Sequence, residues 1–238
     1  MGLKESGLRG SLRNVSVGID AIPDETLYRH NGSETETVDG ETVDPWPDIV
    51  GDVDLAAFNS PTLQEGSLNG TDAVLTDGID DGLEYAPNLA SDVTEPLTKI
   101  FALSVESEPD GENIWRDNVG GNNEIQITSD DYRLLIDGNS DLGGSPVVGD
   151  QIVTLAVDNS EAILRVNGSQ IASVESSEDV VIMSASERGA YAADIRNDIQ
   201  YLNASWSEII TIDGRLSGDD LTSEEQRLED EANMDVLS

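Results

Sequence analysis

The feature that most constrains the fold is a series of short apolar runs separated by turn-forming residues. Beyond Trp46 these runs are rich in β-branched residues and recur about every 8 to 12 residues, a rhythm typical of sandwiches and barrels. The sequence predicts strands at residues 26–29, 73–76, 83–85, 99–106, 113–116, 124–128, 132–137, 151–158, 161–166, 170–175, 180–184, 199–204 and 207–213. We therefore expect an all-β antiparallel sandwich.

The clearest local unit lies between Gln151 and Glu175. The turn sequences at residues 158–161 and at Asn167-Gly168 separate three alternating runs. Both kinds of turn suit hairpins, because Asn and Gly tolerate the left-handed backbone conformation that tight turns require. These three strands should form an antiparallel meander.

One helix is predicted after Leu221, near the end of the sequence. Thr222 or Ser223 could cap it, because acidic residues and a Glu-Gln pair follow within the first turn. Leu221, Leu228 and Ala232 would share one face of this helix. We expect the helix to shield one end or edge of the sandwich.

The chain carries a large negative charge, with 49 Asp plus Glu against 12 Lys plus Arg and a formal net charge of -37. Such a surface repels phosphate, so nucleic-acid partners are excluded and anionic membrane surfaces are disfavoured. Self-repulsion opposes folding in dilute buffer, whereas molar salt shortens the Debye length to about 3 Å. The composition indicates a saline environment. Intrinsic disorder is the alternative, but 37% hydrophobic residues in distinct runs argue against it.

Rare residue types exclude several chemistries. The chain has no Cys, which removes disulfides, cysteine nucleophiles and thiolate metal sites. The single His30 disfavours a histidine-based triad or zinc cluster. No run approaches the roughly 20 apolar residues of a membrane span, and the first residues lack the apolar core of a signal peptide. We expect synthesis in the cytoplasm and no membrane insertion.

Charge and turn residues divide the chain into three predicted parts. Lys4, Arg9 and Arg13 lie in the first thirteen residues, opposed only by Glu5, so we interpret residues 1–22 as an arm that docks onto an acidic neighbour. The alternative is a frayed terminus. Residues 23–45 have the composition of an acidic linker that contains one short strand, and residues 46–238 hold the sandwich with its terminal helix.

Several segments jointly resemble a known family. Residues 45–48 (PWPD), 68–70 (LNG) and 74–83 (VLTDGIDDGL) are similar, in this order, to the opening of concanavalin A-like lectin/glucanase domains of the laminin G type, as found in phage structural proteins. Residues 207–217 and the helix with Glu224, Glu225 and Arg227 are similar to the family's last strand and terminal helix. Thr76 departs from the family, which usually has Phe there. The resemblance implies a jelly-roll sandwich over about residues 46–235.

The opening residues 7–13 (GLRGSLR) resemble virion proteins of haloarchaeal tailed viruses. This resemblance implies a non-enzymatic structural protein of the virion: a capsid turret or decoration protein, or a tail-fibre subunit. Its expected partners are further copies of itself, capsid or tail proteins, and a glycoprotein or glycan of the host surface. Two alternatives stay open, a calcium-assisted carbohydrate-binding lectin module of a halophilic cell and a glycoside hydrolase.

The hydrolase alternative depends on residues 108–112. Glu108, Asp110 and Glu112 have the spacing of glucanases that resemble this fold, in which an alternating strand places three carboxylates on one face. Here Pro109-Asp110-Gly111 is a turn sequence, and a turn cannot hold that array. We therefore predict a surface hairpin loop and no catalytic residues.

Two further groups are candidate binding residues. Asp77, Asp80 and Asp81 could supply oxygen ligands to Ca²⁺, which the family resemblance implies for some members; the alternative is a structural turn with solvated carboxylates. Trp115 and Tyr191 lie near loops of small residues and are candidates for glycan contact. The alternative for both aromatic residues is burial in the core.

Overall fold

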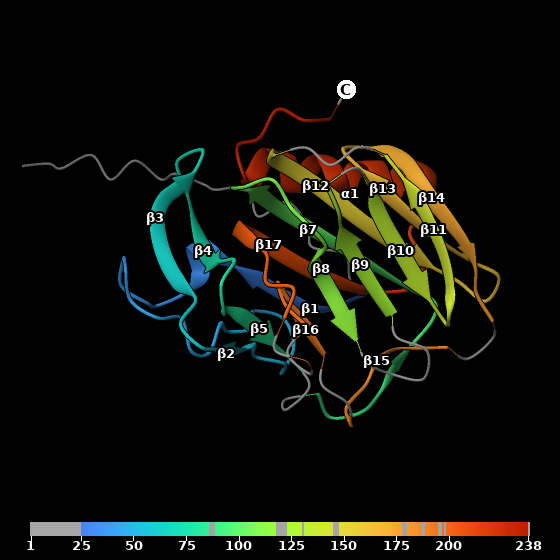
Figure 1. The fold of residues 1–238 in the computed structure, drawn as a ribbon, viewed down its shortest axis with the longest axis horizontal. Helices are drawn as coiled ribbons and strands as arrows, with labels where there is room; N and C mark the ends of the chain where they lie inside the picture. Colours follow the sequence, from blue (N-terminus) through green and yellow to red (C-terminus); the bar gives the residue numbers. More distant parts are fainter. Residues whose placement is uncertain are drawn as a thin grey trace, which may run out of the picture.

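The computed structural model describes residues 25–85, 89–117, 123–129, 131–144, 148–177, 180–186, 189–194, 197 and 199–237. Within these ranges, antiparallel strands build two main sheets that lie one in front of the other (Figure 1). The larger sheet has the order β14 (Ser169–Glu175), β13 (Glu161–Val166), β12 (Gly149–Val157), β7 (Leu97–Val105), β17 (Asn203–Asp213), β4 (Thr71–Asp77) and β3 (Thr62–Leu68), with β1 (Thr26–Asn31) also paired to β17.

The smaller sheet has seven described strands, in the order β11 (Asn139–Gly143), β10 (Tyr132–Ile136), β9 (Asn123–Ile127), β8 (Glu112–Asp117), β16 (Gly189–Tyr191), β5 (Gly82–Glu84) and β2 (Ala56–Phe58). A separate ribbon pairs β6 (Val93–Thr94) with β15 (Val181–Met183), and a short 3-10 helix, η1 (Gly32–Glu34), follows β1. The predicted all-β antiparallel sandwich is confirmed.

Both faces of the larger sheet are covered, as alternation along β7 shows. Phe101 and Leu103 belong to the core between the two sheets, whereas Ile100 and Ala102 face the helix α1 (Gly218–Glu231). This explains why β7 is a continuous buried run rather than a half-polar strand. The helix lies beside β12 and β13 at the top of Figure 1.

Most predicted strands are present with shifted ends, and the meander of β12, β13 and β14 is confirmed. The prediction of two strands at residues 199–204 and 207–213 is wrong, because β17 is one continuous strand from Asn203 to Asp213. A register irregularity between Trp206 and Glu208 switches the alternation of inward and outward residues, and this switch mimics a strand boundary in the sequence.

The terminal helix begins four residues earlier than predicted, at Gly218. Its N-cap is Ser217, in an extended conformation, so Thr222 and Ser223 are not caps. Asp219 and Asp220 lie in the first turn, where negative side chains stabilise a helix through their interaction with its dipole. The predicted face is confirmed, because Leu221, Leu228 and Ala232 are buried against the larger sheet. The described residues include no helix long and apolar enough to cross a membrane.

The segment predicted as a linker, residues 23–45, packs onto the sandwich from Thr26 onward. β1 pairs with β17 over residues 26–31, and Val43 and Trp46 are fully buried in the core. The many acidic residues of this segment favoured the prediction of a linker, although a few of its apolar residues are buried in the core. The sandwich therefore begins near residue 26 rather than at residue 46. The predicted arm, residues 1–22 with Lys4, Arg9 and Arg13, lies outside the described residues.

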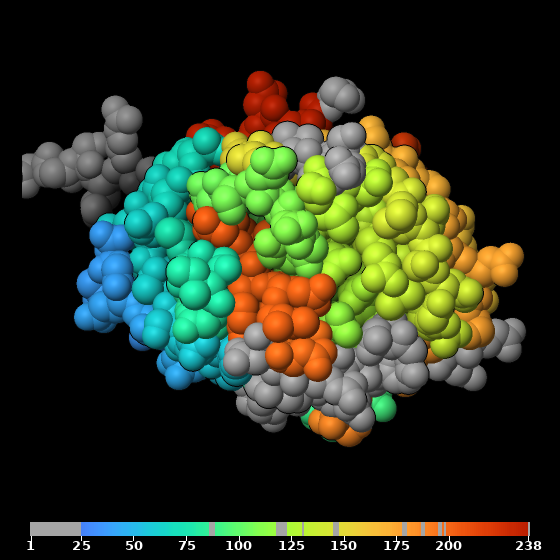
Figure 2. All heavy atoms as spheres, viewed as in Figure 1, coloured from blue at the N-terminus to red at the C-terminus, as the bar shows by residue number. Residues whose placement is uncertain are grey.

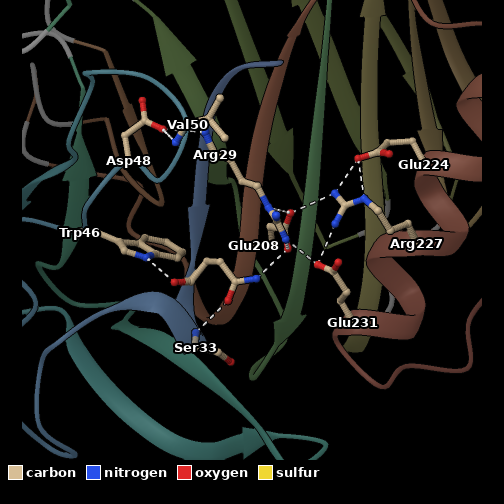
Figure 3. Close-up of polar contacts among 10 residues, drawn as sticks. Arg29, Ser33, Trp46, Asp48, Val50, Glu208, Glu224, Arg227 and Glu231 are labelled. Atoms are coloured by element: carbon tan, nitrogen blue, oxygen red, sulfur yellow. Dashed lines mark hydrogen bonds and ion pairs between the residues drawn. The ribbon is translucent and has the colours of Figure 1, made fainter. Parts of the chain in front are cut away.

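A cluster of buried ion pairs fastens α1 to the sheet (Figure 3). Glu208 on β17 accepts hydrogen bonds from Arg29 Nε at 2.7 Å and from Arg227 Nη2 at 3.1 Å. Arg29 also contacts Glu231, and Arg227 contacts both Glu224 and Glu231. The cluster therefore links β1, near the start of the described residues, to β17 and α1, near their end.

Candidate functional site

The structure rules out Trp115 and Tyr191 as glycan contacts. Trp115 on β8 is fully buried and Tyr191 on β16 is 2% exposed, because both side chains point into the core between the two sheets. The small residues around position 190 are buried too, so they pack the sheet instead of opening a loop. The alternative of core burial is the one observed.

These aromatic residues surround a buried lysine. Lys99 on β7 is fully buried, and its Nζ donates to the Tyr191 hydroxyl at 2.9 Å and to Thr211 Oγ1 at 3.1 Å. The Nζ lies 5.2 to 5.7 Å from the ring centroids of Tyr85, Trp115 and Tyr191. Burial lowers the pKa of Lys99 to about 7, against a smaller opposing effect of a buried carboxylate. Lys99 and the aromatic residues around it therefore belong to the buried interior of the sandwich.

The predicted cation ligands do come together. Asp77 ends β4, and the turn that follows brings Asp80 and Asp81 back toward it, so that one oxygen from each lies within 4.8 Å of the others. The backbone N–H groups of Ile79 and Asp80 donate to Asp77 Oδ1 at 2.8 and 3.2 Å, which fixes the turn. Asp77 and Asp80 are exposed, whereas Asp81 is buried.

Electrostatics at this acidic cluster, defined as Asp77, Asp80 and Asp81, favour a cation. Burial raises the pKa of Asp81 despite a hydrogen bond from the Ser60 N–H, and the charges of Asp77 and Asp80 raise it further. A bound cation would relieve that repulsion. Ca²⁺ takes about six to eight oxygens, so three carboxylates would be completed by water or backbone carbonyls. The oxygen-only donor set fits a hard cation such as Ca²⁺.

A groove of about 350 Å³ adjoins the acidic cluster. Gly78 and Ile79, from the same turn, form one wall; residues 110–112 and residues 199–201 form the others. Figure 2 shows the three parts of the chain that contain these walls, coloured teal, green and orange, next to one another on the face in view. Two large apolar side chains are exposed to solvent at this groove: Ile79 is 74% exposed and Ile199 is 48% exposed. We call this feature the rim groove.

The polar walls of the rim groove are held in place by hydrogen bonds between segments distant in sequence. Asn113 donates through its backbone N–H and its side-chain amide to the carbonyl and the side chain of Gln200, both at 3.1 Å. Gln200 has a φ of 62°, a left-handed conformation that is unfavourable for a residue with a side chain. These two bonds hold it there. Behind it, Tyr201 stacks on Phe58 with ring centroids 6.1 Å apart.

The hairpin loop predicted at residues 108–112 is confirmed as a turn. Gly111 has a φ of 98°, and the Asp110 N–H donates to the Glu112 carboxylate. Glu108 is exposed outside the groove, whereas Asp110 and Glu112 line it. The three carboxylates therefore do not form the one-sided array of a strand.

Sequence reasoning missed residues 199–201, which form one wall of the rim groove. They were predicted as strand because Ile199, Tyr201 and Leu202 give a β-like apolar pattern. Only Asn203 onward continues as a strand. Ile199 next to a polar Gln200 is a weak signal, since single exposed apolar residues are common on protein surfaces.

Comparisons with known proteins give no family. No family model matches the sequence, and no curated protein matches it. Solved structures do match, and the three described next share 12% to 13% sequence identity with this chain.

Three of these solved structures show which kinds of protein share the fold. Trypanosoma rangeli sialidase in complex with the inhibitor DANA aligns with a TM-score of 0.57 and 13% identity, over 86% of this chain and 32% of that chain. Domain 4 of AbnA, a GH43 extracellular arabinanase from Geobacillus stearothermophilus, was solved in complex with arabinotriose. It aligns with a TM-score of 0.55 and 13% identity, over 88% of this chain and 100% of that chain. The receptor binding domain of botulinum neurotoxin D aligns with a TM-score of 0.61 and 12% identity, over 86% of this chain and 53% of that chain.

The chain thus spans about a third of the sialidase chain and about half of the neurotoxin chain. At identities of 12% to 13% the likeness concerns the backbone and carries no residue roles. It agrees with the two antiparallel sheets described above. The chain has a jelly-roll-like β-sandwich fold.

Proposed function

We propose that this chain is a non-catalytic recognition module that binds carbohydrate in the rim groove. The observation that carries the proposal is the pairing of exposed Ile79 and Ile199 with the polar groups of Asp110, Glu112 and Gln200 in one groove. Sugars present apolar C–H faces and ring hydroxyls together, so a groove with both kinds of wall suits them.

The neighbours in fold support a binding role. The AbnA domain was solved with arabinotriose, and the neurotoxin domain is a receptor binding domain. Both have the same sandwich architecture as this chain at a TM-score above 0.5. Fold likeness alone does not transfer a ligand, so the proposal rests on the groove and uses the neighbours only as a precedent.

Calcium is part of the proposal. Asp77, Asp80 and Asp81 would hold it, and the turn that carries them supplies Gly78 and Ile79 to the rim groove. The cation would supply a fixed positive charge that orders this turn and so shapes one wall. A site with two exposed carboxylates and one buried carboxylate would be weak, and it would fill mainly where the concentration of divalent cations is high.

A glycan array read in molar salt, with calcium and with a chelator, tests this function. We expect binding that the chelator weakens, and loss of binding in Gln200→Ala and Ile79→Ser. The matched control is Val38→Ser, because Val38 is also an exposed apolar residue (60% exposed) but does not line the rim groove. Equal binding by all three variants would overturn the assignment of the site.

Calcium has its own readout in thermal unfolding. A ligand at 100 times its Kd stabilises the folded state by about 2.7 kcal/mol, so calcium should raise the unfolding temperature. Asp80→Asn should remove this shift, whereas Asp52→Asn, at another exposed acidic residue, should keep it. Polysaccharide turnover that is lost in Glu112→Gln would contradict the non-catalytic part of the proposal.

The finer proposal places this module in the virion of a halophilic tailed virus, as a turret, decoration or tail-fibre subunit. It is supported by the sequence resemblance, by the net charge of -37 and by the basic residues Lys4, Arg9 and Arg13. The arm would attach the module to a capsid or tail protein, and the sandwich would project as a homo-oligomer toward host glycans.

Deletion of residues 1–22 tests the attachment. We expect the shortened chain to fold with an unchanged circular dichroism spectrum and to be missing from purified particles. Incorporation without the arm would overturn the docking role. Neighbouring genes for portal, capsid and tail proteins would support the viral assignment, and their absence would favour the lectin of a halophilic cell.

A further inference from the structure

A second groove lies on the opposite face of the larger sheet from the core, beside α1. It has a volume of about 1020 Å³, and its walls are the outer side of α1 and the chain that leaves β17 at residues 213–216. Glu25, the first described residue, also lines it. We call it the helix groove.

The helix groove is strongly acidic. Glu25, Asp213, Asp220 and Asp230 line it, are exposed, and form no ion pair with any other described residue. Two arginines also line it, but their charge is already neutralised. Arg215 pairs with Asp158 and Glu161, and Arg227 pairs within the cluster around Glu208.

The chain itself carries a basic segment, residues 1–13, in which Lys4, Arg9 and Arg13 are opposed only by Glu5, and residues 14–24 join it to the wall of this groove. The Asp213 N–H donates to the Glu25 carbonyl at 2.8 Å, so the exit point of residues 1–24 is fixed beside the acidic residues. In that segment each basic residue directly follows a leucine, in Leu3-Lys4, Leu8-Arg9 and Leu12-Arg13. Leu216 offers the groove an apolar side chain next to its carboxylates.

We propose that the helix groove binds the basic residues 1–13 of the same chain, with Arg9 and Arg13 against its unpaired carboxylates. The tether favours this occupant, because a short linker gives an effective concentration in the millimolar range that a second copy rarely matches. Arg13 is twelve residues before Glu25, and about 3.3 to 3.6 Å per residue is enough to reach any point of the groove. The proposal is independent of carbohydrate binding in the rim groove.

The docked arm has a consequence for attachment. An external acidic partner must displace the arm from the helix groove before it can bind Lys4, Arg9 and Arg13. The groove then acts as a competitor that keeps the arm off weakly acidic surfaces, and only a more acidic or more extensive surface captures it.

Disulfide trapping tests this in the full-length chain, which has no cysteine of its own. The test pair is Ser11→Cys with Ser223→Cys, because Ser11 lies between the two arginines and Ser223 is an exposed residue of the groove. The control pair is Ser11→Cys with Ser140→Cys, an exposed residue of β11 on the smaller sheet. Mild oxidation at submicromolar protein and moderate salt should give an intramolecular disulfide faster in the test pair, by about tenfold, or about 1.4 kcal/mol of preference.

Charge variants then establish what holds the arm. Asp220→Asn with Asp230→Asn should bring the trapping rate of the test pair close to that of the control pair, whereas Asp52→Asn with Glu65→Gln, at exposed acidic residues outside the groove, should leave it unchanged. Equal rates in the test and control pairs would overturn the proposal. Disulfide-linked dimers that increase with protein concentration would also overturn it, because they would show that the groove takes the arm of a second copy.

Discussion

The two faces of the larger sheet bury charge in opposite ways. Under α1, Glu208 lies between Arg29 and Arg227, and the side chains of all three are less than 10% exposed. On the face toward the smaller sheet, Lys99 is fully buried yet forms no ion pair with any described carboxylate; it has two hydroxyl groups and three aromatic rings instead. One face pairs its charges, and the other surrounds a single amine.

The difference shows in proton affinity. Burial alone would raise the pKa of Glu208, but the hydrogen bonds and charges of Arg29 and Arg227 hold it below its ordinary value. Burial lowers the pKa of Lys99 to about 7, because hydroxyls and rings compensate only part of the lost hydration. Pairing therefore keeps charge inside the protein, whereas isolation drives the group toward its neutral form.

Breaking the paired cluster should have the largest effect. Glu208→Gln removes the carboxylate that two buried arginines share, and we expect it to lower the free energy of unfolding by about 3 to 5 kcal/mol. Chemical denaturation measures this loss. Glu231→Gln is the matched control, because its carboxylate contacts the same two arginines but is 34% exposed, and it should lose about 1 kcal/mol or less. Equal losses would show that burial of the pair does not matter.

Removing the isolated charge of Lys99 should change the free energy of unfolding in the opposite direction. We expect Lys99→Met to raise the free energy of unfolding at pH 7 by about 1 to 3 kcal/mol, because an apolar chain of similar length suits the aromatic cage better than an amine. The folded pKa of about 7 lies below the unfolded value of 10.5, so between these values the unfolded chain binds a proton that the folded chain lacks. Stability of the wild type should therefore rise from pH 7 to pH 9, by up to about 1.4 kcal/mol per unit.

Denaturation at several pH values separates this effect from other titrations. Lys99→Met should show a flatter profile than the wild type between pH 7 and pH 9. Lys4→Met, which alters the one other lysine of the chain, should keep the wild-type slope. A slope that survives in Lys99→Met would show that the lysine stays charged in the folded state.

His30 extends the comparison to a second buried base. Its Nε2 hydrogen-bonds the Val53 carbonyl at 2.8 Å, and burial lowers its pKa to about 4. Since the folded pKa lies below the ordinary 6.5, stability is lost as the pH falls from 6.5 toward 4, by about 2 kcal/mol at pH 5. The chain has one histidine, so NMR of the imidazole reports it directly. A midpoint near 6.5 in the folded protein would contradict this.

The fold was largely predictable because it depends on local patterns. Asn167-Gly168 predicts its hairpin correctly, and the Leu221, Leu228 and Ala232 face predicts where α1 packs. The Asp77 turn brings its carboxylates together because they are close in sequence. The departure at Thr76, by contrast, is explained by contacts distant in sequence, since its hydroxyl accepts from the Trp206 indole and donates to the Leu202 carbonyl.

Long-range contacts were not predictable in the same way. Arg29 and Glu208 are 179 residues apart, and no periodicity indicates that they meet. The rim groove combines three turns whose exposure depends on how the sheet edges end. Trp115 was misassigned for a related reason: it lies near a loop of small residues in the sequence, but its neighbours in space are Lys99 and Tyr85, contributed by other strands.

The smallest effect is expected where charges are paired but not buried. Arg215 contacts Asp158 and Glu161, whose side chains are 34% and 42% exposed. Desolvation alone would raise the pKa of Asp158, but the hydrogen bonds from Ser160 and Arg215 together outweigh it and lower this pKa to about 2. Water and salt screen such pairs, so Arg215→Ala should lower the free energy of unfolding by about 1 kcal/mol or less, and by less still in molar salt. The loss in Glu208→Gln should persist in that salt, because ions do not reach a buried pair. If Arg215→Ala were as damaging as Glu208→Gln at both salt concentrations, pairing rather than burial would account for the difference between the two faces of the sheet.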